Sequence, residues 1–80
     1  MPRYFFHTDT LSRHTDDEGL DLDGPVEARR EAIRACGEML RDCPEGFWGS
    51  RPWSVTVTDV ACLILCEVNI DGTASGAAPM

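Results

Sequence analysis

Two histidines and several carboxylates lie close together near the start of the sequence, and imidazole with carboxylate is a ligand set that divalent metals accept. His7 follows an aromatic run, and His14 lies in the polar segment after it, beside Asp16 and Asp17. The two histidines lack the i, i+4 or H-x-H spacing of strong metal motifs. These four residues are therefore a candidate metal site. The alternative is a sheet histidine hydrogen-bonded to a solvated acidic loop.

Four cysteines are the other residues that could bind a metal or form disulfides. Cys36 and Cys43 are separated by about 10 Å along a predicted helix, and Cys62 and Cys66 by about 13 Å along a predicted strand. Neither pair can share an ion or a disulfide over such a distance. No C-x2-C motif occurs. We expect Cys36, Cys43 and Cys66 to pack as small apolar side chains and to stay reduced.

Motifs of covalent catalysis are missing from the sequence, which has no G-x-S-x-G, no S-x-x-K and no glycine-rich phosphate loop. A small sheet covered by one helix also leaves little room for a substrate pocket. The sequence therefore argues against an enzyme, and we predict no catalytic residues and no cofactor.

The charge balance bears on the class of partner. The chain has 80 residues, with 7 basic and 14 acidic side chains and a net charge of −7. That charge repels phosphate backbones, so we expect no nucleic-acid partner. No run approaches the roughly 20 apolar residues of a membrane helix, and the first residues lack the layout of a signal peptide. We therefore expect no membrane contact and a cytoplasmic location.

The elements that must position these residues follow from periodicity. Apolar residues alternate in β-prone runs and recur at steps of three and four in one longer segment. This pattern predicts an α+β domain over residues 1–70 in ββαββ order, with an antiparallel sheet of three to four strands and one helix packed on one face. The predicted strands cover 3–8, 19–22, 53–59 and 63–70, and the predicted helix covers 25–42.

The same patterns predict which side chains face the core. Residues 9–18 are expected to form a loop, and 71–80 a disordered C-terminal tail, because both segments offer little to bury. The strand residues predicted to face the helix are Tyr4, Phe6, Val55, Val57, Ile64, Cys66, Val68 and Ile70. The apolar stripe predicted on the helix is Ala28, Ala32, Ile33, Cys36, Met39, Leu40 and Cys43.

Several segments carry a resemblance to a known family. They are the opening Met-Pro-Arg-Tyr-Phe-Phe-His, the acidic Asp-Glu-Gly at 17–19, and Trp-Ser-Val-Thr-Val-Thr-Asp at 53–59. With them the chain resembles, over residues 1–70, a family of short uncharacterised bacterial proteins catalogued as a domain of unknown function. The resemblance implies a bacterial cytoplasmic protein and no particular activity. In such proteins a glycine usually stands where this chain has Cys62, and a bulky apolar residue where it has Cys66.

Apolar residues outside the predicted core are candidate interaction residues. Phe5, Leu63 and Leu65 are predicted on the sheet face that the helix leaves uncovered, and Trp48 lies in an aromatic connection. The leading hypothesis is a non-enzymatic protein-interaction module that acts as a homodimer or as a partner subunit. One alternative is a metal-binding hydrolytic or sensory protein that uses His7, His14 and the nearby carboxylates. Another is an antitoxin-like regulator, by analogy of fold.

Overall fold

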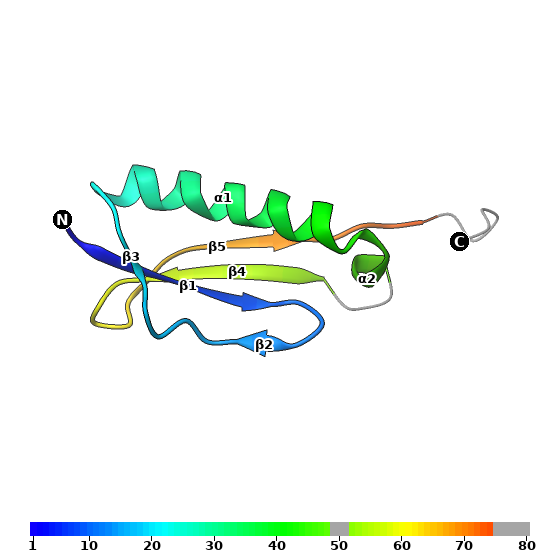
Figure 1. The fold of residues 1–80 in the computed structure, drawn as a ribbon, viewed down its shortest axis with the longest axis horizontal. Helices are drawn as coiled ribbons and strands as arrows, with labels where there is room; N and C mark the ends of the chain where they lie inside the picture. The colour runs from blue at the N-terminus through cyan, green and yellow to red at the C-terminus, as the bar shows by residue number, and fades with distance from the viewer. Residues whose placement is uncertain (49–51, 75–80) are drawn as a thin grey trace.

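The structure is a computed structural model that describes residues 1–48 and 52–74. It is an α+β fold in which one long helix crosses one face of an antiparallel sheet (Figure 1), as the sequence pattern predicts. Residues 75–80 of the predicted tail lie outside the described residues. The elements are β1 (Arg3–Asp9), β2 (Arg13–His14), β3 (Leu20–Asp21), α1 (Pro25–Asp42), α2 (Pro44–Trp48), β4 (Trp53–Thr58) and β5 (Ile64–Ile70).

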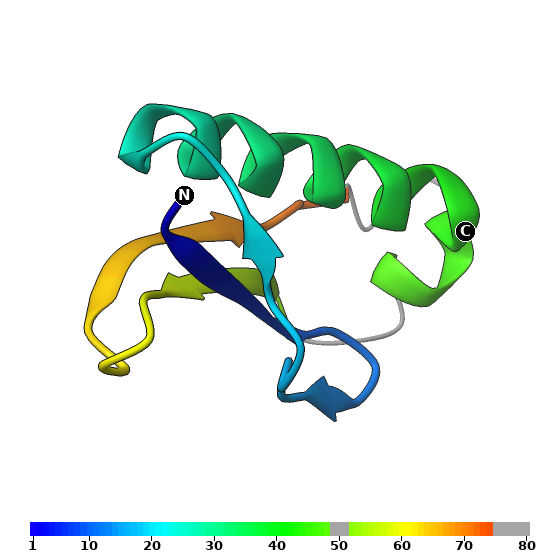
Figure 2. The same cartoon turned by 60° about the vertical axis from the view of Figure 1, so that its left-hand side comes forward.

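The strand order is β2-β1-β4-β5, and every neighbouring pair is antiparallel. Strand β3 pairs with β1 on the same edge as β2 but at the other end, where Tyr4 lies opposite Leu20. The two short strands therefore share the outer edge of β1, and β5 forms the opposite edge of the sheet. Figure 2 shows α1 above the sheet with β3 crossing in front of β1.

Two short elements lie where the sequence pattern predicts none. Strand β2 falls within the expected loop, because β1 runs on to Asp9 and a turn through Thr10 and Ser12 brings His14 opposite Thr8. Helix α2 falls at the start of the expected aromatic connection. Its first residue is Pro44, which suits a first helical position because proline has no N–H to leave unsatisfied.

Helix α1 begins at Pro25 for the same reason, with Glu27 in its first turn and Arg41 in its last, each complementing the helix dipole. Its buried residues are Ala28, Ala32 and Cys36, one helical turn apart. These small side chains let the helix approach the sheet closely. Burial raises the pKa of the Cys36 thiol, which keeps it protonated.

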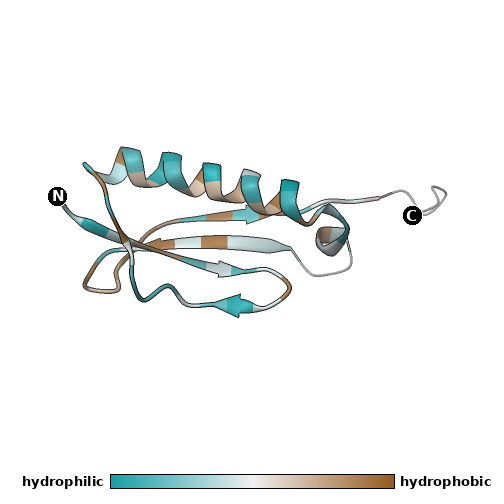
Figure 3. Ribbon diagram, in the orientation of Figure 1, coloured by the Kyte–Doolittle hydropathy of each residue, from teal (hydrophilic) through white to brown (hydrophobic). Residues whose placement is uncertain are grey.

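The core lies between α1 and the middle strands. Tyr4, Val55 and Val57 are almost fully buried against the helix, as the alternation of β1 and β4 predicts. Figure 3 shows hydrophilic and hydrophobic residues interspersed along α1, whose buried residues lie on one side, one helical turn apart. Side chains packed around the core are Phe6, Leu22, Met39, Cys66, Val68 and Ile70.

Neither described helix has the combination of length and apolarity that a membrane crossing needs.

Two residues predicted to face the core are instead exposed. Ile64 is 61% exposed because a β-bulge interrupts the β4–β5 ladder, which pairs Val57 with Cys66 but Thr58 with Ile64. Leu65 is left unpaired, and the alternation of faces reverses beyond it. Ile33 is also exposed, because α1 buries a narrower stripe than its apolar spacing suggests. The predictions for Ile64 and Ile33 are therefore wrong.

The turn between β4 and β5 holds Cys62 in a left-handed conformation, with φ of 63°. The Asp59 carboxylate organises this turn by accepting hydrogen bonds from the N–H groups of Ala61, at 2.9 Å, and Leu63, at 3.0 Å. The Cys62 N–H donates to the Asp59 carbonyl at 3.0 Å. A side chain in this conformation crowds the backbone, whereas glycine adopts it freely.

Replacing Cys62 by glycine should therefore raise the free energy of unfolding by roughly 0.5–1 kcal/mol, since relief of the left-handed strain exceeds the added freedom of the unfolded chain. Urea denaturation followed by circular dichroism would measure the difference. Ala61→Gly is the matched control, because Ala61 has no positive φ, and it should destabilise the protein. A Cys62→Gly variant less stable than the native chain would contradict the strain argument.

Candidate functional site

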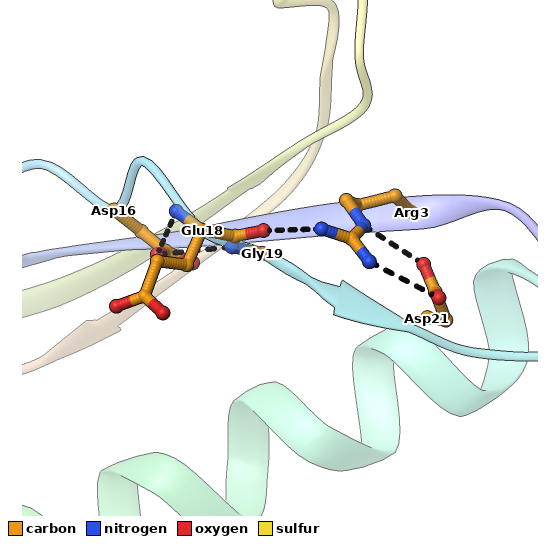
Figure 4. Close-up of polar contacts among 5 residues, drawn as sticks. All are labelled: Arg3, Asp16, Glu18, Gly19 and Asp21. Carbon is orange, nitrogen blue, oxygen red and sulfur yellow. Dashed lines mark hydrogen bonds and ion pairs between the residues drawn. The ribbon is translucent and has the colours of Figure 1, made fainter.

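The outer edge of β1 is completed by a side chain where its two short partner strands leave a gap. The Asp16 Oδ2 atom accepts a hydrogen bond from the Phe6 N–H at 3.1 Å. Its Oδ1 atom accepts from the N–H groups of Glu18, at 3.1 Å, and Gly19, at 3.2 Å (Figure 4). Partial burial alone would raise the pKa of Asp16, but the N–H donors of Phe6, Gly19 and Glu18 outweigh burial and lower it.

Gly19 allows this loop to lie against β1. Its φ is 76°, and a Cβ there would stand 2.9 Å from both the Tyr4 carbonyl oxygen and the Phe5 ring. Arg3 then anchors the end of the loop: its Nη1 donates to the Glu18 carbonyl at 2.9 Å and its Nε to Asp21 Oδ1 at 2.9 Å (Figure 4). The hydrogen bond from Arg3 lowers the pKa of Asp21. The acidic loop is thus a fixed part of the sheet edge.

His7 connects this loop to β4. Its Nδ1 accepts a hydrogen bond from the Asp16 N–H at 3.1 Å, and its Nε2 lies 3.0 Å from Thr58 Oγ1. Because Nδ1 is an acceptor, the neutral ring carries its proton on Nε2 and donates it to the threonine oxygen. A histidine that already holds this proton cannot remove the proton of Thr58, which is itself buried. The hydrogen bond between His7 and Thr58 is therefore structural, and the two residues are not arranged as a general base and its nucleophile.

The four candidate metal ligands, His7, His14, Asp16 and Asp17, do not converge on one point, and the donor atoms of His7 and Asp16 are already hydrogen-bonded. Both ring nitrogens of His7 and both oxygens of Asp16 are engaged in these hydrogen bonds. His14 lies opposite Thr8 across the ladder, so it faces the side of the sheet that His7 does not. Asp17 is exposed. Among residues 1–48 and 52–74, no group of three histidine, cysteine or acidic residues is placed to hold a metal ion.

The sheet face opposite α1 is mostly polar. Three rows cross it in register: Phe5 with Thr58 and Ile64, then His7 with Thr56 and Glu67, then Asp9 with Ser54 and Asn69. The Thr56 hydroxyl donates to Glu67 at 3.0 Å. A shallow hollow of about 520 Å³ runs over the two polar rows. Apolar side chains thus occupy only the row nearest the β4–β5 turn.

The four predicted interaction residues lie in different places. Phe5 is half-buried in the apolar row, and Leu63 is exposed in the turn immediately before β5. Leu65, the bulge residue, lines a hollow of about 620 Å³ with Tyr4 and Pro25, near the beginning of α1. Trp48 is half-exposed in α2 and packs edge-on against the Phe47 ring, with 5.4 Å between the two ring centroids.

Sequence reasoning missed several exposed apolar residues. The sequence pattern predicts a core position for Ile64 and no role for Val60, yet both are exposed in the same segment as Leu63 and Leu65. On α1, Val26 and Ile33 are also exposed. Their separation of seven residues, which brings side chains to one line of a helix, is the signal that could have identified them.

Comparisons with known proteins give a family and no functional assignment. The model of the family described as "Domain of unknown function (DUF6894)" matches residues 3–71, and the chain belongs to that family. Neither the curated proteins nor the solved structures contain a match.

Proposed function

We propose that this member of the family is a non-enzymatic protein-interaction module that acts as a homodimer. The observation that carries the proposal is a cluster of exposed aliphatic side chains at the β4–β5 turn, formed by Val60, Leu63, Ile64 and Leu65. Isolated exposed apolar residues are ordinary on proteins, but these four fall within one short segment, residues 60–65, and such a concentration of exposed aliphatic side chains favours an interaction surface. A domain of this size buries only about 60% of its unfolded surface, so it gains stability by burying more in a dimer.

The polar groups support a binding role over catalysis. The His7 ring, the Asp16 carboxylate and the Thr58 hydroxyl all satisfy one another or the backbone around β1. These hydrogen bonds hold the sheet edge in place, and they occupy the imidazole, carboxylate and hydroxyl atoms that catalysis would use. The hydrogen-bonded network therefore supplies a rigid frame for the exposed aliphatic cluster, as a precise interface requires.

The homodimer predicts a doubled mass in solution. Sedimentation equilibrium at tens of micromolar protein should give about twice the 8.8 kDa chain mass. Leu65→Glu should shift the protein toward the monomer, because it puts a charge among aliphatic side chains that a second copy would cover. Leu11→Glu is the matched control, since Leu11 is exposed on the β1–β2 connection, and it should remain dimeric.

Two outcomes would count against the proposal. A native protein that stays monomeric at that concentration would remove the homodimer. A dimer that tolerates Leu65→Glu as well as it tolerates Leu11→Glu would show that the exposed cluster is not the contact.

A further inference from the structure

Strand β5 is an open edge of the sheet among the described residues. The outer edge of β1 is covered at its ends by β2 and β3 and between them by Asp16, whereas no described strand pairs with the far side of β5. Its seven residues include one charged residue, Glu67, and no lysine or proline. Natural sheets use such residues to block pairing at exposed edges. This edge has little protection of that kind.

An apolar line on α1 lies above this same edge. Val26, Ile33 and Leu40 are seven residues apart, so they fall on one line along the helix. Val26 is 52% exposed and Ile33 60%. The other flank of α1 carries Asp42, which lines a hollow together with Thr10 and Leu11 of the β1–β2 connection. The Val26–Ile33–Leu40 line therefore faces the β5 side of the molecule.

The geometry points to a second copy of the chain as the occupant of this surface, in an inference that rests on the proposed homodimer. We propose that β5 pairs antiparallel with the partner's β5 while the two α1 helices pack side by side through the Val26–Ile33–Leu40 line. Ile33 lies midway between Val26 and Leu40. A twofold axis near Ile33 therefore brings Val26 of each copy close to Leu40 of the other copy. Such self-complementary spacing is what a twofold interface needs.

The spacing of the layers fits this arrangement. Helix α1 packs over β4 and β5, so pairing of the two β5 strands would set the two helices about two strand spacings apart, roughly 10 Å. Helices in contact are separated by about 8–10 Å. The two helices would therefore touch without moving from the sheets that they cover.

The size and polarity of the surface also fit a second copy. A seven-residue strand spans roughly 23 Å, and the molecule is 21 × 19 Å in cross-section. The product of these two lengths gives a flat contact of roughly 450 Å² on each copy. The accessible surface buried by both copies together is larger than twice that value and is close to about 1,000 Å², the lower bound for a specific interface. A register centred on Val68 would set Glu67 opposite the partner's Asn69 and avoid two carboxylates facing each other.

Sedimentation equilibrium of Ile33→Glu tests the surface, because Ile33 is exposed and its replacement should leave the fold intact. We expect its dimer dissociation constant to rise at least tenfold, while Leu11→Glu, at the opposite edge, dissociates like the native chain. Circular dichroism would verify that both variants are folded. Hydrogen exchange of the native chain gives an independent readout: amides of residues 64–70 should become better protected as the concentration rises through the dimer transition.

The outcomes separate this inference from the function on which it rests. A native chain that is monomeric defeats both. A dimer that Leu65→Glu disrupts but Ile33→Glu does not, with exchange at residues 64–70 independent of concentration, overturns the edge-and-helix contact and leaves the homodimer standing. Weakening by Ile33→Glu together with concentration-dependent protection supports both.

Discussion

Replacing Trp53 by alanine should lower the free energy of unfolding by about 3–5 kcal/mol, the usual cost of deleting a buried aromatic side chain. Trp53 is only 2% exposed at the start of β4. Its ring packs edge-on against the Phe47 ring, with 5.4 Å between the two ring centroids. A chain of this length is stabilised by roughly 4–12 kcal/mol in total. The variant should therefore be partly or wholly unfolded, which urea titration followed by far-ultraviolet circular dichroism would measure.

Trp48→Ala is the matched control, because it removes the same ring from a half-exposed position. Trp48 also contacts Phe47 edge-on, so its loss should cost about 0.5–1.5 kcal/mol. The comparison isolates burial from aromatic contact. Equal losses for the two variants would show that the burial of the Trp53 ring adds nothing to the stability of the protein.

The central part of this fold could be predicted from the sequence because its pattern is strong. In β4 the alternation of valine with hydroxyl residues leaves one choice of buried face, and Val55 and Val57 occupy it. In α1 the proline at the start and the small residues one turn apart define both the beginning and the buried side. Local propensity and burial agree in both elements, and agreement of that kind specifies a structure.

The remaining features depend on contacts that alternation does not encode. The bulge at Leu65 reverses the faces of β5, so Ile64 is exposed although its position in the pattern suggests burial. The direction of the hydrogen bonds at His7 follows from the backbone of Asp16, nine residues later in the chain. Neither feature has a signature in residue type, and the site could therefore be predicted only as a group of polar residues near His7.

These two features together determine which edge of the sheet is available. Asp16 and His7 hold the acidic loop against β1, which satisfies that edge from within the chain. Strand β5 has no such loop among the described residues, and the bulge exposes aliphatic side chains at its beginning. The asymmetry between the two edges is the structural reason why we propose an interaction surface on the β5 side.

Asp16→Ala should lower the free energy of unfolding at neutral pH by roughly 2–3 kcal/mol, since three backbone N–H groups lose a charged acceptor and each can recover only part of that bond from water. The loss should also detach the loop from His7, because the Asp16 N–H holds the ring at Nδ1. Chemical denaturation measures the stability. The His7 ring resonances in an NMR spectrum report the detachment, and Gly24→Ala, outside the network, should leave them unchanged.

Asp16→Asn separates the charge from the shape of the side chain through its pH dependence. The backbone donors hold the pKa of Asp16 below the ordinary value of about 3.9. A carboxylate with a lowered pKa contributes stability that is complete above the unfolded pKa and is lost as the pH falls through the folded pKa. The native chain should therefore exceed Asp16→Asn in stability from about pH 5 upward, and the difference should shrink below about pH 4. A difference between the two proteins that stays constant down to strongly acidic pH would show that the charge of Asp16 contributes nothing to closing the edge of β1.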